Sequence, residues 1–218
     1  MARQNETEDN QNGKRREKLI QAAARLFNKN GYDRTTVRQI AAEVGLTSGS
    51  IFYYFESKEV LLEEVIAFGM KSGLVLVEEF LSGVTGPLSR FHALLASHLS
   101  AITGRPGDAH EVSFSAWKSL PPESRQRLRS LNQLYREIWM QSLTELKAHG
   151  YLHSSPEHCR LVLIAALNWS PVWTDVTTKS QLNKTVDHFC SVLLNMTDAE
   201  FRDLLMAEQA EEAAKAEA

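Results

Sequence analysis

Apolar residues recur at helical spacing through most of this 218-residue chain. In the segment 14–30 they follow the i, i+3, i+4, i+7, i+8 pattern of an amphipathic helix. The positions concerned are Leu19, Ile20, Ala23, Leu26 and Phe27. No segment alternates apolar and polar residues over the length of a strand, so the pattern predicts an all-α fold.

Glycine and proline divide the rest of the chain into helical hairpins. The breaks fall at 83–87, 104–107, 121–122, 150 and 154–156. Three of the prolines, Pro87, Pro122 and Pro156, stand where a first helical turn tolerates proline. The polar residues 1–13 lack apolar periodicity and are predicted to form a disordered tail. The segment 207–218 has no apolar stripe and is predicted to be flexible.

Two short helices joined by a tight turn are predicted between Thr36 and Phe55. Thr36 suits an N-cap with Gln39 as its capping-box partner, and Gly45 suits the turn. Thr47 is expected to cap the second helix, over 48–55, with Ile51, Phe52 and Phe55 on its buried face. Ser57 is expected to cap a longer helix that runs to about Leu81.

Such a pair is the helix-turn-helix pattern, in which the second helix enters the DNA major groove. Small residues at the start of that helix permit close approach, and hydroxyls and cations suit phosphates and base edges. The candidate DNA contacts are Thr36, Arg38, Thr47, Ser48, Gly49, Ser50, Tyr53, Tyr54 and Lys58.

The distribution of charge supports this interpretation. The segment 14–58 holds nine basic and four acidic residues, whereas the whole chain has a net charge of −3. A basic head on an acidic body indicates that only the head meets a polyanion. The run Lys14-Arg15-Arg16 is either a solvated helix start or a further DNA contact.

The motifs in this region resemble those of the tetracycline-repressor (TetR) family. They are AARLFNKNGY, then TTVRQIAAEVG, then GSIFYYFESKEVL, and the resemblance covers about 16–62. It implies an all-helical homodimer, with a helix-turn-helix domain over 14–60 and a ligand-binding and dimerisation domain over 61–206. Phe52 and Tyr54 depart from the family's usual Tyr and His, so Phe52 is assigned to the core.

Weaker resemblance over ALNWSPVW (166–173) is to TetR-family regulators of fatty-acid, acyl-CoA or steroid breakdown. It implies a hydrophobic or acyl-CoA-like effector that releases a repressor from a palindromic operator. Aromatic residues of this part are either core or pocket; the candidate pocket residues are Phe114, Trp117, Tyr135, Trp139, Asn168, Trp169 and Trp173. Arg105, Arg125, Arg127 and Arg129 are either solvated or phosphate-binding. The family's usual interface implies dimer contacts at Leu161, Ile164, Ala165, Val186, Phe189 and Leu193.

Other classes of protein are disfavoured. No nucleophile elbow, phosphate loop or metal motif is present, so we expect no enzyme, no cofactor and no metal site. His149 and His153 are separated by Gly150, which breaks the helix between them. The polar N-terminus and the two widely spaced cysteines favour a cytoplasmic protein with reduced thiols. The alternative is a DNA-binding protein of this fold that has no small effector and is controlled by a protein partner.

Overall fold

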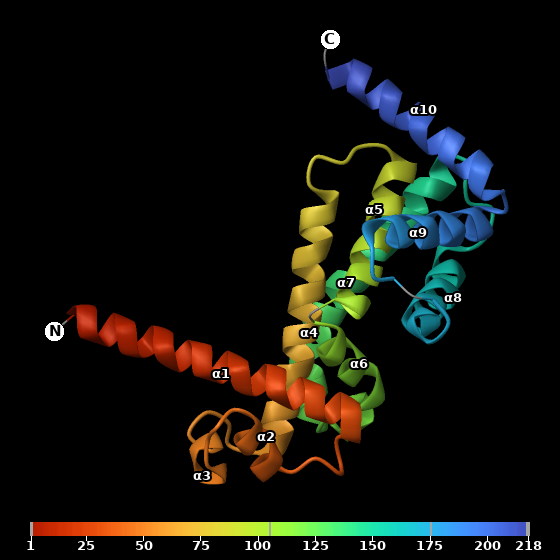
Figure 1. The fold of residues 1–218 in the computed structure, drawn as a ribbon. Coiled ribbons are helices and arrows are strands. Elements are labelled where there is room, and N and C mark those ends of the chain that lie inside the picture. Colours follow the sequence, from red (N-terminus) through yellow and green to blue (C-terminus); the bar gives the residue numbers. More distant parts are fainter. Residues whose placement is uncertain (1, 105, 175, 217–218) are drawn as a thin grey trace. The chain divides into compact units, whose positions relative to one another are not determined.

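The computed structural model describes residues 2–104, 106–174 and 176–216, and describes side chains from Gln11 onward. Over these residues the chain is helical and contains no strand, which confirms the predicted fold class. The helices (Figure 1) are α1 Ala2–Asn30, α2 Val37–Glu43, α3 Ser48–Ile51, α4 Lys58–Leu81, α5 Pro87–Thr103, α6 Gly107–Ser115, α7 Pro122–Ala148, α8 Pro156–Trp169, α9 Lys179–Leu194 and α10 Asp198–Ala216, with single 3₁₀ turns η1 Trp117–Ser119 and η2 Ser170–Val172.

The chain divides into two compact units, each with its own apolar core. The first comprises Met1–Lys71 and Pro106–Leu131, and the second comprises Ser72–Arg105 and Asn132–Ala218. The segment 106–131 thus packs with the N-terminal helices, whereas the sequence pattern placed it in one continuous domain over 61–206. Contacts between α6 and α1 account for this, because Asn28 donates a 2.7 Å hydrogen bond to Asp108.

The predicted helix boundaries hold wherever glycine or proline marks them. Gly31 and Gly45 adopt the positive φ that ends α1 and turns the chain after α2. Ser57 accepts a hydrogen bond from the Val60 amide, and α4 ends at Leu81, as expected. Among the described helices, none combines the length and apolar character that a membrane span requires.

Both chain ends differ from the sequence-based expectation. Helix α1 begins at Ala2, within the segment expected to be disordered, and no proline interrupts this stretch. Helix α10 continues to Ala216, through most of the segment expected to be flexible. The carboxylate of Glu208 accepts hydrogen bonds from the amides of Leu88 and Ser89, at 3.0 and 2.7 Å. It thereby caps the N-terminus of α5, where negative charge is favoured, and joins α10 to α5 within the second unit.

Two glycines in α4 have opposite surroundings, which gives a matched test of the packing. A Cβ on Gly69 would lie 2.9 Å from the backbone carbonyl carbon of Ala109, whereas a Cβ on Gly73 would meet no described atom within 4 Å. We expect Gly69→Ala to lower the free energy of unfolding by about 1–3 kcal/mol, because α6 must move away. Gly73→Ala should raise it by about 0.5–1 kcal/mol, because alanine is the better helix former.

Thermal and denaturant unfolding of the two variants measure this difference. A neutral Gly69→Ala would contradict the close packing of α4 against α6, and destabilisation by Gly73→Ala would contradict the open space around Gly73.

Candidate functional site

Two threonines hold the helix-turn-helix in place. The backbone N–H of Gln39 donates to the Thr36 hydroxyl at 3.2 Å, and the backbone N–H of Thr36 donates to the side-chain oxygen Oε1 of Gln39 at 2.8 Å. This confirms the predicted capping box. The buried hydroxyl of Thr35 bonds to the carbonyl oxygens of Leu26 and Gly31, which fixes the end of α1 to the start of α2. Sequence reasoning missed Thr35, since a threonine before a capping threonine gives no separate signal.

The start of α3 presents small polar residues to solvent. Thr47, Ser48 and Gly49 are exposed, and Ser50 is half-buried. The sequence suggested that the Thr47 hydroxyl caps the α3 backbone. In the structure it instead forms a hydrogen bond with the Ser50 hydroxyl at 2.9 Å. A Cβ on Gly49 would meet no described atom within 4 Å, so packing inside this unit does not require glycine there. This end of α3 therefore offers an unobstructed surface.

The three aromatic residues that follow α3 have different environments. Helix α3 ends at Ile51 rather than at Phe55, because the amides of Tyr53 and Tyr54 bond three residues back and tighten the turn. Ile51 and Phe55 fill the core, whereas Phe52 is 55% exposed, so its assignment to the core is wrong. Phe52 lies about 100° further round the turn than Ile51, and that rotation carries its ring to the outside.

The two tyrosines predicted as DNA contacts also differ in exposure. Tyr53 is 76% exposed and stands edge-on to Tyr54, with ring centroids 5.2 Å apart. Tyr54 is half-buried and packs against the core of the first unit. The outward aromatic surface is therefore formed by Phe52 and Tyr53, with Tyr54 behind them.

The cations of the first unit form two groups. Arg38 on α2 is exposed, as are Lys14, Arg15 and Lys18 on α1. Arg16 instead pairs with Glu64 at 2.7 Å and lies over the Phe55 ring. Positive charge is thus available to a polyanion from α1 and α2.

Lys58, like Arg16, interacts with other residues of the first unit. Its ammonium donates to the Tyr32 carbonyl oxygen at 2.6 Å and lies 4.1 Å from the centroid of the Tyr32 ring. Burial and the neighbouring Glu59 carboxylate raise the pKa of Tyr32 to about 12, so its hydroxyl stays protonated and donates to Glu59. The structure therefore ties Lys58 to the loop between α1 and α2, whereas the sequence suggested a DNA contact.

We expect Lys58→Ala to lower the free energy of unfolding by about 1–2 kcal/mol, because a half-buried carbonyl loses its charged donor. Lys29→Ala removes an exposed cation near the end of α1 and should change it by less than about 0.5 kcal/mol. Urea unfolding of both variants measures the difference. Equal stability combined with weakened DNA binding by Lys58→Ala would favour a direct contact between Lys58 and phosphate.

The residues predicted to line an effector pocket are divided between the two units. Phe114 and Trp117 belong to the first unit, where Phe114 is half exposed and Trp117 packs against the core. Trp169 and Trp173 are more than half exposed in the second unit, so their side chains face solvent in this chain. Tyr135, Trp139 and Asn168 remain as buried or half-buried members in one unit.

These three residues meet around His98, a buried histidine of α5. His98 Nδ1 lies 2.5 Å from the Tyr135 hydroxyl, and Nε2 lies 3.0 Å from Asn168 Oδ1. The Trp139 ring is edge-on to the imidazole, with centroids 5.7 Å apart. Burial raises the pKa of Tyr135, so the phenol remains neutral. Sequence reasoning missed His98, although it continues the apolar face formed by Phe91, Leu94 and Leu95.

The arginines considered as phosphate ligands differ in their surroundings. Arg127 forms a two-pronged ion pair with Glu63, at 2.7 and 2.6 Å, and is therefore engaged within the first unit. Arg129 is exposed and Arg125 is half-buried. Arg105 lies outside the described residues.

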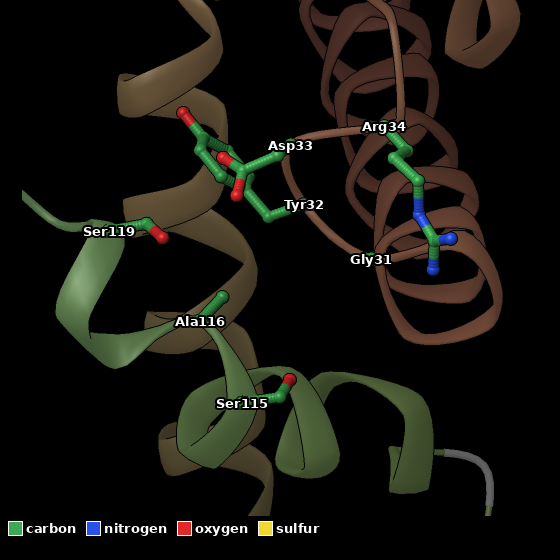
Figure 2. Close-up of a pocket in the computed structure, with 7 residues that line it drawn as sticks. All are labelled: Gly31, Tyr32, Asp33, Arg34, Ser115, Ala116 and Ser119. Carbon is green, nitrogen blue, oxygen red and sulfur yellow. The ribbon is translucent and has the colours of Figure 1, made fainter.

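A pocket of about 420 Å³ lies in the first unit, between the α1–α2 loop and the segment of α6 and η1 (Figure 2). It is lined by Gly31, Tyr32, Asp33, Arg34, Ser115, Ala116 and Ser119. None of these is a predicted pocket residue. The Arg34 Nε donates to the Asn30 carbonyl, and Figure 2 shows the guanidinium beside Gly31 and directed away from Ser119. The side chains converging on this pocket are therefore mainly hydroxyls and one carboxylate.

The predicted dimer contacts lie on α8 and α9, which pack together. Leu161 and Ala165 are exposed, and Ile164, Phe189 and Leu193 are half-buried. Val186 is fully buried in the core of its own unit, so its side chain is not free for a partner. The sequence missed Val162 and Val192, which are 69% and 65% exposed. Both helices thus carry exposed apolar side chains.

Comparison with known proteins identifies the two parts of the chain. Residues 19–65 match the family model described as bacterial regulatory proteins of the tetR family. Residues 85–197, more than half of the chain, match the model described as a tetracyclin repressor-like C-terminal domain. The first match spans the helix-turn-helix, and the second includes α8 and α9.

Individual proteins are similar to this chain over most of its length. The transcriptional repressor KstR2 of Mycolicibacterium smegmatis is 30% identical over 62% of this chain and 66% of its own length. This chain thus spans about two thirds of that relative. The superantigen PfiT is 33% identical, with a TM-score of 0.69 over 82% of this chain and 95% of that one.

A further solved structure shows likeness of fold. The structure of AibR with isovaleryl coenzyme A and operator DNA has a TM-score of 0.74 at 18% identity, covering 84% of this chain and 100% of that one. With both of its parts matched in order, the chain belongs to the tetR family of bacterial regulatory proteins, a helix-turn-helix family of DNA-binding transcription regulators.

Proposed function

We propose that this chain is a transcriptional repressor that binds a near-palindromic operator as a homodimer and leaves it when a small effector binds the second unit. The outward face of α3 carries the proposal. Ser48 and Gly49 are exposed there and Tyr53 is exposed in the turn after α3, and no packing within the unit requires a glycine at 49. Arg38 supplies positive charge from α2, and the α1 cations supply more. Small residues, hydroxyls and cations together suit a major groove and its phosphates.

The exposed apolar side chains on α8 and α9 support the proposed pairing of two copies of the chain. A cluster of exposed apolar side chains is a usual feature of a subunit interface. Leu161, Val162 and Val192 contribute to this surface. A two-fold symmetric pair reads an inverted repeat, with half-sites about 34–36 Å apart or a multiple of that distance.

The proposed effector contacts are Tyr135, Trp139 and Asn168, with His98 between them. Their polar groups lie within an otherwise apolar core, which is the usual character of a ligand site in a helical bundle. The buried Trp139 indole lies edge-on to the Tyr135 ring, with centroids 6.4 Å apart, so the two side chains form one cluster with His98. The proposed effector is a hydrophobic or acyl-CoA-like molecule; AibR was solved with isovaleryl coenzyme A, and KstR2 is a repressor by name.

Selection of duplexes from a randomised library tests the DNA-binding part. The expected product is an inverted repeat bound by two copies, or by two such pairs, with the mass of the complex measured by light scattering. Enrichment of a single half-site bound by one copy would contradict the symmetric dimer.

A thermal-shift series with acyl-CoAs, fatty acids and steroids tests the effector part. A true effector at 100 times its dissociation constant adds about 2.7 kcal/mol of stability, and it should release the selected duplex. Tyr135→Phe removes the hydroxyl that bonds His98 and should weaken this response. Tyr151→Phe, on a half-buried tyrosine of the same unit, should leave it unchanged. Equal responses from the two variants would remove Tyr135 from the effector site.

A further inference from the structure

Phe52 is the apolar member of the surface proposed to meet DNA. Its ring is 55% exposed, while Ile51 and Phe55 on either side of the turn are 1% and 2% exposed. Because those two side chains already occupy the core positions, Phe52 has no place in that core. Gly49 and Tyr53, which are near it in the chain, are exposed as well, so Phe52 belongs to the outer surface of the unit.

A phenyl ring in a major groove has few favourable partners. Base edges there present hydrogen-bond donors, acceptors and one apolar group, the 5-methyl of thymine. A ring that covers a donor or an acceptor removes water from it without replacing the hydrogen bond, which is unfavourable. A ring that covers the methyl group removes two apolar surfaces from water, which is favourable. A phenyl ring in the major groove therefore favours base pairs that contain thymine, although it cannot form a hydrogen bond.

We infer that Phe52 is a specificity-determining residue that packs against the 5-methyl group of one thymine in each half-site. The inference rests on the proposed placement of α3 in the major groove. Gly49 assists it, because the absence of a side chain there lets the start of α3 approach the bases closely. Tyr53 differs in role, since its hydroxyl can donate to a phosphate oxygen.

Uracil substitution tests the contact, because uracil lacks only the thymine methyl. The probe is the tightest duplex that wild-type protein selects from a randomised library, with each thymine replaced singly by uracil. At one thymine per half-site, the change should weaken wild-type binding about 4-fold, and about 15-fold when both half-sites are changed.

The same measurement on variants completes a thermodynamic cycle. Phe52→Ala should bind thymine and uracil duplexes within 2-fold of each other, and Phe52→Leu should keep part of the preference. Tyr53→Phe retains the ring beside Phe52 and should keep the full uracil effect, whatever its own affinity.

Two outcomes would overturn the inference separately from the proposed function. If a duplex is selected but no thymine is sensitive to uracil, Phe52 reads no methyl group. If Phe52→Ala keeps the full uracil effect, another residue reads it. Failure of the wild-type protein to select any duplex would instead overturn DNA binding, and this contact with it.

Discussion

Replacing Phe27 by alanine is expected to lower the free energy of unfolding by about 3–5 kcal/mol. Phe27 is 2% exposed and packs edge-on against Tyr32, with ring centroids 5.2 Å apart. The cavity left by its removal would lie where α1, the loop after it and Lys58 meet. Most of the cost comes from lost contacts that the surrounding helices cannot restore.

Phe52→Ala is the matched control for that loss. It removes the same side chain from the same unit, but from a position that is 55% exposed, so the unfolding free energy should change by less than about 0.5 kcal/mol. Denaturant unfolding of the two variants gives the comparison. Comparable destabilisation by both would contradict the outward position of Phe52, on which its proposed contact with DNA depends.

The second large effect is expected in the salt dependence of DNA binding. A protein that contacts six to ten phosphates loses about 10³–10⁵ in affinity between 50 and 200 mM salt, because binding releases condensed counterions. The basic head of this chain should behave in this way. Arg38→Ala should lower the slope of log affinity against log salt by about 1.8, which is one phosphate contact for each of two subunits.

Lys147 provides the control for the salt series. It is an exposed cation of the second unit, and Lys147→Ala should leave the slope unchanged. Fluorescence anisotropy with the selected duplex at four or more salt concentrations measures both slopes. Identical slopes for wild-type protein and Arg38→Ala would show that Arg38 makes no phosphate contact.

The elements that the sequence predicted well are those with local causes. Thr36 and Gln39 form their capping box, and Gly31 and Gly45 adopt positive φ, because each signal acts within a few residues. The end of α4 at Leu81 follows in the same way from the glycines after it.

The errors involve competition between neighbours for the same space. Phe52 was expected in the core because it is apolar, yet Ile51 and Phe55 already fill the available volume. Val186 was expected at a subunit interface, but the second unit's own core takes it. Hydrophobicity alone cannot decide which apolar side chain is buried, because a close-packed core has room for only some of the apolar side chains near it.

Contacts between residues far apart in the chain could not be predicted from the sequence for a different reason. Lys58 bonds to Tyr32, 26 residues away, and His98 joins Tyr135 and Asn168 from two other helices. A single sequence carries no local pattern that marks such partners. The packing of 106–131 with the N-terminal helices is of the same kind, since it depends on the match between two distant surfaces.

The proposed DNA binding depends most on the outward surface at α3 and the turn after it, where Tyr53 is the most exposed aromatic residue. The most direct measurement compares the affinities of wild-type protein and Tyr53→Ala for the selected duplex at 50 mM salt, with subunit mass and unfolding curve checked in parallel. Loss of one hydrogen bond to a charged group in each of two subunits predicts affinity lower by about 10²–10⁴ in an otherwise intact dimer. Equal affinity of the two proteins for the duplex would contradict the placement of this surface on DNA.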